Sequence, residues 1–234
     1  MLVQNFTKDT ITRYNLWFKR YFKVQHIELF FTLLRKIGIL NNTRKKYFEE
    51  KEEKDTMVEL LKFEDFDQMY SIMEQSFPYD EYRGYEGQKQ LFENPEYKVF
   101  IHRNEETKEI DGFLSAWEFD DILFFEHFAV SSKVRNGGIG GRMLREVLTQ
   151  VNKLTCLEVE LPEGELEKRR ISFYERNGFC YNPYPYTQPS IATGRKPIPL
   201  RIMTYQRTVT EAEYQKIKNL LYRRVYHVSE QQMK

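Results

Sequence analysis

The chain has 234 residues and a formal net charge of +1, with 41% hydrophobic and 30% charged residues. This composition supports a folded core and excludes a disordered chain. Residues 57–234 carry 24 Lys/Arg against 28 Asp/Glu, so they are mildly acidic. That balance argues against a nucleic-acid partner and is compatible with a cationic ligand such as an amine.

The cysteine content and the length of the apolar runs indicate where in the cell the protein is expected. Two cysteines, Cys156 and Cys180, are too few for a disulfide framework in a chain of this length. The N-terminus lacks the pattern of a secretory signal. The longest dense apolar run, 29–34, falls far short of the roughly 20 residues that span a bilayer. We therefore expect a cytoplasmic, soluble protein without a transmembrane segment, either a monomer or a homodimer.

Residues 1–56 differ from the rest of the chain. They carry 12 Lys/Arg against 7 Asp/Glu, and apolar residues recur at helical spacing over 10–40. The pattern predicts a basic helical extension, separated from the main domain by a charged run at 44–55. Three interpretations remain open: the extension docks on a partner or a membrane surface, it packs on the main domain, or translation begins at Met57.

Strands and helices alternate from Met57 onward. Apolar periodicity predicts strands over 58–63, 97–103, 110–119, 122–130, 154–161, 179–186 and 200–205. Helices are expected from the capping pair Asp65/Gln68 to about 75, and over 81–92, 137–151 and 163–177. A last helix runs from the capping box Thr210/Glu213 to about 226. These elements predict an α/β (α+β) domain over 57–226, with a mixed, mostly antiparallel sheet flanked by helices, and a flexible tail over 227–234.

The segment from Val130 to Arg142 carries the most specific signal. A buried strand ends at Val130, the sequence R-N-G-G-I-G-G-R opens at Arg135, and an amphipathic helix follows at once. Glycines allow a tight turn against a ligand, and the first N–H groups of a helix form an anion site. The expected ligand is a phosphate or pyrophosphate.

Two common phosphate motifs do not fit this turn. A P-loop requires Gly-Lys-Ser/Thr where this chain has Gly-Gly-Arg. A dinucleotide fingerprint that starts at Gly138 requires glycine at position 143, which is Met143. The pattern that fits is R-x-x-G-x-G, at Arg135, Gly138 and Gly140. It resembles the signature of the GNAT superfamily of acetyl-CoA-dependent N-acetyltransferases.

A second match lies about 40 residues downstream. The run Ser172–Phe179 is similar to the F-Y-x-x-x-G-F helix end of that superfamily, and Ile110–Phe113 is similar to its preceding strand. The resemblance covers roughly 58–206. It implies an N-acetyltransferase that moves an acetyl group from acetyl-CoA to a primary amine of a small molecule or peptide by direct attack.

The resemblance also implies residue roles. A pseudo-strand of Phe128, Ala129 and Val130 would run beside the pantetheine arm, and the Val130 N–H would bind the thioester carbonyl. The pyrophosphate would be held by eight consecutive residues: Arg135, Asn136, Gly137, Gly138, Ile139, Gly140, Gly141 and Arg142. Tyr174 would lie near the sulfur and act as the general acid. Glu167 departs from the family's frequent Asn, which puts a cofactor contact there in doubt.

Glu126 is the candidate general base, because it interrupts an apolar strand four residues before Val130. Burial is expected to raise its pKa toward a useful range. Strand alternation places His127 on the opposite face, as a core histidine. By the same rule Glu126 shares its face with three residues, namely Phe124, Phe128 and Val130. A bulge in the strand would change this arrangement.

The acceptor side is less well defined. Two aromatic segments, 77–85 and 181–196, are candidates to shape the pocket, with Tyr79, Tyr82, Tyr184 and Tyr186 as candidate contacts. The spacing of His and Cys residues predicts no metal site. Two other interpretations keep the same fold: a non-catalytic acyl-CoA-binding regulatory module, and an acyltransferase with a different acyl chain or acceptor.

Overall fold

The computed structural model describes residues 56–134 and 137–228. The predictions for 1–55, for Arg135 and Asn136, and for the tail beyond 228 lie outside these residues. The proposed division of the chain at residue 57 therefore stays a prediction. In the part of the chain that the structure describes, no helix is both long and apolar enough to cross a membrane.

The described residues form one eight-stranded sheet with the order β1-β2-β3-β4-β5-β8-β6, and β7 pairs with β8. The strand bounds are Glu59–Leu60 (β1), Tyr97–Arg103 (β2), Ile110–Glu118 (β3), Ile122–Val130 (β4), Leu154–Glu160 (β5), Phe179–Tyr181 (β6), Tyr186–Gln188 (β7) and Ile198–Tyr205 (β8). The β4–β5 pair is parallel, and the other pairs are antiparallel. The predicted mixed, mostly antiparallel sheet is confirmed.

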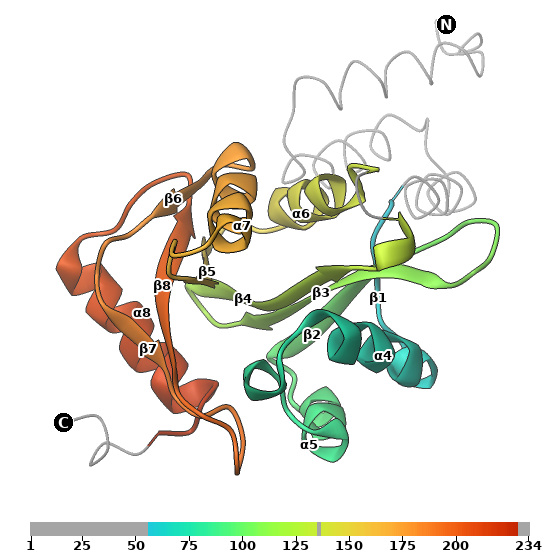
Figure 1. Cartoon of the computed structure of the whole chain (residues 1–234), viewed down its shortest axis with the longest axis horizontal. Coiled ribbons are helices and arrows are strands. Elements are labelled where there is room, and N and C mark those ends of the chain that lie inside the picture. The colour runs from blue at the N-terminus through green and yellow to red at the C-terminus, as the bar shows by residue number, and fades with distance from the viewer. Residues whose placement is uncertain (1–55, 135–136, 229–234) are drawn as a thin grey trace, which may run out of the picture. The chain divides into compact units, whose positions relative to one another are not determined.

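Helices cover both faces of this sheet (Figure 1). Their bounds are Phe66–Ser76 (α4), Tyr85–Gln90 (α5), Ile139–Thr149 (α6), Glu165–Arg176 (α7) and Glu211–Arg224 (α8). In Figure 1, α6 and α7 lie above the sheet, and α4 and α5 lie below it. The two faces are called here the α6 face and the α4 face.

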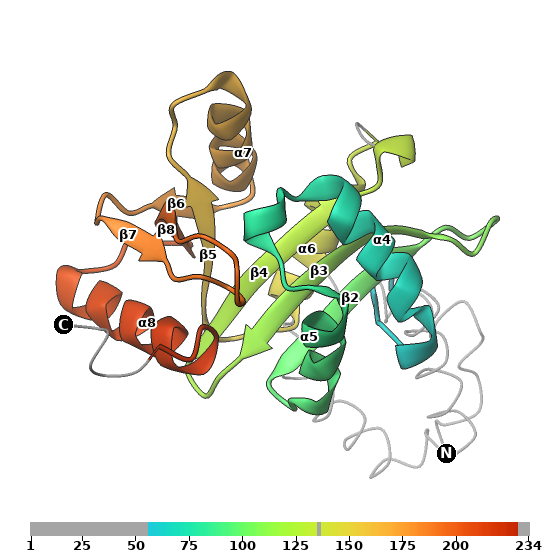
Figure 2. The same cartoon turned by 60° about the horizontal axis from the view of Figure 1, so that its bottom comes forward.

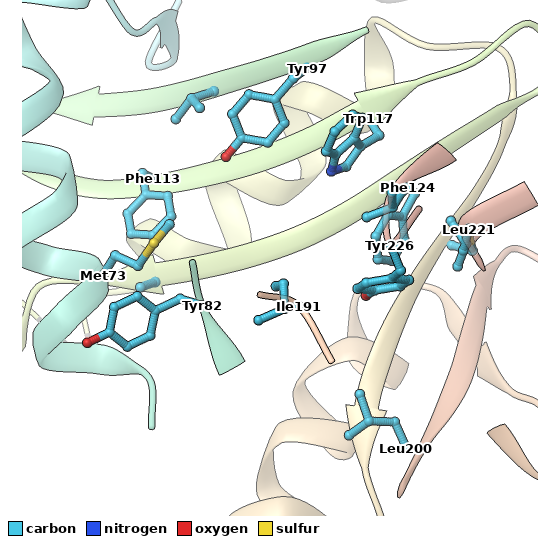
Figure 3. Packing of buried hydrophobic residues seen from close by; sticks show 14 of the residues in the cluster. Met73, Tyr82, Tyr97, Phe113, Trp117, Phe124, Ile191, Leu200, Leu221 and Tyr226 are labelled. Carbon is cyan, nitrogen blue, oxygen red and sulfur yellow. The ribbon is translucent and has the colours of Figure 1, made fainter. Parts of the chain in front are cut away.

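Each face of the sheet has its own hydrophobic core. The core on the α4 face includes Trp117, Phe124 and Tyr226 and takes in side chains of α8 (Figure 3). The core on the α6 face contains Met143, Leu144 and Val147 of the amphipathic helix α6 together with side chains of β3, β4 and β5. Strand β4 is covered on both sides and is almost continuously apolar apart from Glu126 and His127.

Three local predictions on the α4 side are wrong. Strand β1 is shorter than predicted. The last bond to β2 beyond it runs from the Leu61 N–H to the Val99 carbonyl, and a 3₁₀ turn begins two residues later, at Phe63. Asp65 makes no side-chain cap, since that turn already precedes α4. Helix α5 begins at Tyr85 rather than 81, because the chain is extended at Tyr82 after a separate 3₁₀ turn.

The predicted capping box of the last helix is confirmed. The Thr210 hydroxyl accepts a bond from the Glu213 N–H, and the Glu213 carboxylate accepts one from the Thr210 N–H. We expect Thr210→Ala to lower the free energy of unfolding by about 1 kcal/mol, because an N–H of α8 loses its partner. Urea unfolding measures this difference, with Thr210→Ser as the control that keeps the hydroxyl. Equal midpoints for Thr210→Ala and the wild type would contradict it.

Candidate active site between two diverging strands

The parallel strands β4 and β5 separate halfway along their length. They pair only over Ile122–Phe125 and Leu154–Leu157, and Figure 2 shows them diverging beyond that point. A cleft of about 1110 Å³ opens there, lined by residues of 125–130 on one side and 157–160 on the other. Its lining includes residues from both faces of the sheet, so the cleft passes between the two strands.

A β-bulge lies where the two strands separate. Ser115 pairs with His127 and Ala116 pairs with Phe125, so Glu126 is the extra residue of β4. Glu126 and His127 therefore both project toward the α4 face. The prediction that alternation places them on opposite faces, with Glu126 beside Phe128 and Val130, is wrong because the bulge interrupts the alternation.

One end of the cleft is formed by the glycine-rich turn. Gly138 has a φ of 73° and stands at the N-cap of α6. A Cβ on Gly140 would lie 3.3 Å from both the Phe128 ring and the Val130 side chain. The predicted residues that line the cleft are Phe128, Ala129, Val130, Gly138, Ile139, Gly140 and Gly141, whereas Gly137 and Arg142 are described but do not line it.

Basic side chains of α7 line the cleft as well. They are Lys168, Arg169, Arg170 and Arg176, and Glu167 is absent from the lining. The first N–H groups of α6 have no partners within their own helix, and the helix dipole favours an anion beside them. Arg170 is paired with Glu160, and Lys168 with Glu165. The turn, together with Arg169 and Arg176, fits a phosphate or pyrophosphate.

Tyr174 of α7 also lines the cleft. Its ring packs against Phe173 and Phe179, with centroids 5.3 and 5.8 Å away. Among the described residues its hydroxyl has no hydrogen bond, and burial raises its pKa to about 12. The phenol is therefore protonated at neutral pH and has a proton to donate.

Five carboxylates also line the cleft, at Glu81, Glu126, Glu158, Glu160 and Glu165. Glu160 and Glu165 are the two that form ion pairs with Arg170 and Lys168. Glu126 is 2% exposed and forms a 2.8 Å ion pair with the buried Arg83. Burial by itself raises the pKa of Glu126, but Arg83 and the neighbouring His127 lower it to about 2. The expected rise is therefore wrong, because the strand sequence could not reveal a buried arginine from another segment.

His127 is a core residue with partners, as expected. Its Nε2 donates to the Glu81 carbonyl at 2.8 Å, and its ring contacts Phe77 edge-on with centroids 5.0 Å apart. Its Nδ1 lies 3.6 Å from the Glu126 carboxylate and 3.4 Å from the Ser115 hydroxyl. These contacts hold the ring against the bulge.

Glu158 is a site residue that the sequence analysis missed. Its Oε2 accepts a 2.7 Å hydrogen bond from the Tyr226 hydroxyl, and its buried Oε1 has no hydrogen-bond partner among the described residues. Burial raises the pKa of Glu158 to about 7. Alternation along β5 could have indicated it, because Glu158 projects to the other face of the sheet from its apolar neighbours Leu157 and Val159.

The four candidate acceptor tyrosines do not line the cleft. The Arg195 guanidinium lies over the Tyr79 ring at 3.1 Å and near the Tyr82 ring at 5.3 Å. The Tyr184 hydroxyl donates to the Val209 carbonyl, beneath α8. Tyr186 lies against Glu158, and its hydroxyl has no hydrogen-bond partner within the described part. Their contact with an acceptor stays a prediction.

A metal centre was not expected. Over residues 56–134 and 137–228, no group of three or more His, Cys, Asp and Glu side chains could hold a metal ion. For the whole chain, the absence of a metal site stays a prediction.

Comparison with known proteins assigns the fold and the family. Residues 64–179 match the model of the acetyltransferase (GNAT) family. A proposed GNAT-family acetyltransferase from Bacteroides thetaiotaomicron is 30% identical, with a TM-score of 0.68 over 74% of this chain and 100% of that one. NAA60 of Arabidopsis thaliana, solved with a bisubstrate analogue, is 15% identical with a TM-score of 0.50 over 63% of this chain and 95% of that one, which shows the fold alone.

A curated relative gives a partial match. It is the proposed acetyltransferase YjbC of Bacillus subtilis (strain 168), which is 29% identical over 127 residues. The match covers 53% of this chain and 63% of the relative, so the chain spans under two thirds of that protein's length. Taken with the Bacteroides structure and the family model, the glycine-rich turn and the diverging strands show that this chain belongs to the GNAT family of acetyltransferases.

Proposed function

We propose that this protein is an N-acetyltransferase that moves an acetyl group from acetyl-CoA to a primary amine. One observation carries the proposal. A single cleft is lined by the glycine-rich turn, by basic side chains of α7 and by the buried carboxylates Glu126 and Glu158. The turn and the basic side chains suit the phosphates of coenzyme A, and the buried carboxylates suit an ammonium group. The two free cysteines are consistent with the cytoplasmic setting that we propose.

The donor side is assigned to residues near the turn. The N-terminus of α6 and the side chains of Arg169 and Arg176 would hold the phosphates. The segment 128–130 would lie beside the pantetheine arm, with the Val130 N–H directed at the thioester carbonyl. Acetyl-CoA supplies an activated acyl group when bound. Holding it beside the amine converts a bimolecular reaction into an effectively unimolecular one.

The acceptor side must deliver a neutral amine, since an ammonium nitrogen has no lone pair with which to attack. It must also let the departing sulfur gain a proton. We assign that second task to Tyr174, whose phenol is protonated at neutral pH. The ion pair with Arg83 makes Glu126 a poor proton acceptor at neutral pH, because its pKa is about 2. We therefore propose that Glu126 acts as a fixed negative charge and not as the base.

Turnover on simple amines tests this function. The full chain is incubated with acetyl-CoA and a panel of butylamine, 1,4-diaminobutane, spermidine, an aminoglycoside and a peptide with a free N-terminus, and thiol release is recorded. We expect saturable release with at least one amine. Binding of coenzyme A without release on any of them would favour a non-catalytic acyl-CoA-binding module. Release with a longer acyl-CoA but not with acetyl-CoA would favour a different acyl donor.

Tyr174→Phe is expected to lower kcat by about 10²–10⁴-fold, because the sulfur loses its proton donor. The ring contacts with Phe173 and Phe179 are kept, so the affinity for acetyl-CoA stays within about twofold of the wild-type value. Steady-state thiol release and calorimetry measure the two quantities. Tyr205→Phe removes a hydroxyl outside the cleft and serves as the matched control. Wild-type kcat in Tyr174→Phe would remove Tyr174 from the mechanism.

A further inference from the structure

We propose that Glu158 is the general base that takes the proton from the acceptor ammonium. The inference rests on the proposed amine acetylation and assigns one residue within it. The carboxylate lies on β5, across the cleft from the bulge at Glu126, and both side chains line the same space. Glu158 thus stands where the two strands have just separated, beside the passage that joins the two faces of the sheet.

The two oxygens of Glu158 have different surroundings. Oε2 is held by the Tyr226 hydroxyl at 2.7 Å, which fixes the orientation of the carboxylate. Oε1 is buried and makes no hydrogen bond in the described part of the chain, although the Tyr186 hydroxyl, which also makes none, lies near the carboxylate. Glu126 Oε2, across the cleft, is a second buried oxygen without a hydrogen bond among the described residues. Unpartnered buried oxygens are costly to a fold, so a native structure that keeps them calls for an explanation. An ammonium group between the two carboxylates would supply N–H donors to both oxygens, and only Glu158 has a pKa that suits it to take the proton.

The charged and titratable groups around Glu158 come from every neighbouring element. They are Arg83, Glu126, Cys156, Tyr186, Tyr222 and Tyr226. Arg83 is committed to Glu126 by their 2.8 Å ion pair, so it does not neutralise Glu158 through a direct contact. Burial raises the pKa of Glu158 to about 7, and the Glu126 charge adds to the rise. The Tyr186 and Tyr226 hydroxyls and, from a distance, the Arg83 charge oppose it. A base with such a pKa is matched to neutral pH.

The proton and electron steps balance. An ammonium N–H bond breaks, its proton moves to Glu158 Oε1, and the nitrogen keeps the electron pair. That pair forms a C–N bond to the thioester carbon, and the C–S bond breaks with its pair going to sulfur. Sulfur takes the Tyr174 proton, the second ammonium proton restores the phenol through water, and Glu158 releases its proton to solvent. One proton leaves per turnover.

The acceptor end of the cleft also limits the substrate. Apolar side chains of Phe77, Ile191 and Leu200 lie beside the carboxylates in its lining, together with the Gln188 amide. The Gln188 Nε2 is buried and, within residues 56–134 and 137–228, unpartnered. The chemistry therefore fits a primary ammonium on an apolar stem that carries a hydrogen-bond acceptor for this amide.

The test compares Glu158→Gln with the wild type, using the panel amine that gives the highest turnover. We expect kcat to fall by about 10²–10⁴-fold, with the affinity for coenzyme A within about twofold. The wild-type rate should fall below pH 7 as Glu158 is protonated, and this acidic limb should be absent in Glu158→Gln. Tyr226→Phe should move the limb to higher pH, because the hydroxyl that opposes the pKa rise is gone. Glu105→Gln, on the exposed β2–β3 turn, is the charge-matched control.

The failures of the two proposals are distinguishable. If the wild type acetylates an amine and Glu158→Gln keeps its rate and its acidic limb, Glu158 is not the base while the proposed function stands. If the wild type binds coenzyme A but acetylates no amine, both proposals fail. Carboxyl ¹³C NMR of the full-length protein is the independent readout. A glutamate that titrates near pH 7 in the wild type and is missing from Glu158→Gln supports the inference, and an ordinary pKa at that position overturns it.

Discussion

Replacing Gly140 with valine is expected to lower the affinity for coenzyme A at least about 100-fold. A Cβ at this position already lies 3.3 Å from the Phe128 ring and the Val130 side chain. The two valine methyl groups would therefore extend into the cleft or push 128–130 away from it. Displacements of about 1 Å at a reacting site cost on the order of 10²-fold in rate, and we expect a loss of similar size in affinity where the cofactor contacts the backbone. Calorimetric titration with coenzyme A measures the effect.

The control for this variant is Gly87→Ala in α5. A Cβ there meets Arg83 Cβ at an ordinary 3.7 Å, outside the cleft lining. Circular dichroism and the urea midpoint establish that Gly140→Val still folds. A folded Gly140→Val with wild-type affinity for coenzyme A would contradict the assignment of the glycine-rich turn.

Replacing Arg83 with methionine is expected to lower the free energy of unfolding by about 3–5 kcal/mol at neutral pH. The change leaves the Glu126 carboxylate, 2% exposed, without its 2.8 Å partner. Removing one member of a buried ion pair costs this much because the remaining charge is uncompensated. The bond from Arg83 to the Val225 carbonyl is lost as well. Urea unfolding followed by fluorescence measures the loss.

The pH dependence of this loss has a definite sign. In the wild type the folded pKa of Glu126, about 2, lies below its ordinary value of 4.5, so its ion pair stabilises the fold above pH 4.5. That contribution disappears as the pH falls through the folded value. The difference between Arg83→Met and the wild type should therefore be largest at neutral pH and shrink in acid.

A double variant isolates the ion pair from the packing. Arg83→Met combined with Glu126→Leu removes both charges and should recover most of the lost stability, because no uncompensated charge remains. A single Arg83→Met variant as stable as the wild type at pH 7 would show that the pair contributes nothing. A double variant as unstable as the single one would trace the loss to packing.

The strands and helices in which apolar residues recur at a regular spacing could be predicted from the sequence. Strands β2 and β4 and the capping box of α8 lie where the residue pattern indicates. The glycine-rich turn could be located as well, because Gly138 and Gly140 are needed for local reasons, a positive φ and a close approach. Such signals reside within one stretch of chain.

The chemistry of the carboxylates could not be predicted in the same way. The bulge at Glu126 depends on how β3 pairs with β4, which alternation within one strand does not contain. The low pKa of Glu126 depends on Arg83, 43 residues away in the chain. The environment of Glu158 depends on Tyr226, which is 68 residues away. Such long-range contacts set the pKa of each carboxylate and so determine which one can accept a proton at neutral pH.

Transfer of labelled acetyl groups tests the central claim most directly. The full-length protein is mixed with acetyl-CoA carrying ¹³C in its acetyl group and with the amine panel, and the amines are analysed by mass spectrometry. We predict one labelled acetyl group on an amine nitrogen, formed in step with free coenzyme A and strongly reduced in Gly140→Val. Free coenzyme A with the label only in acetate, or no reaction while coenzyme A binds in the cleft, would contradict the assignment as an N-acetyltransferase.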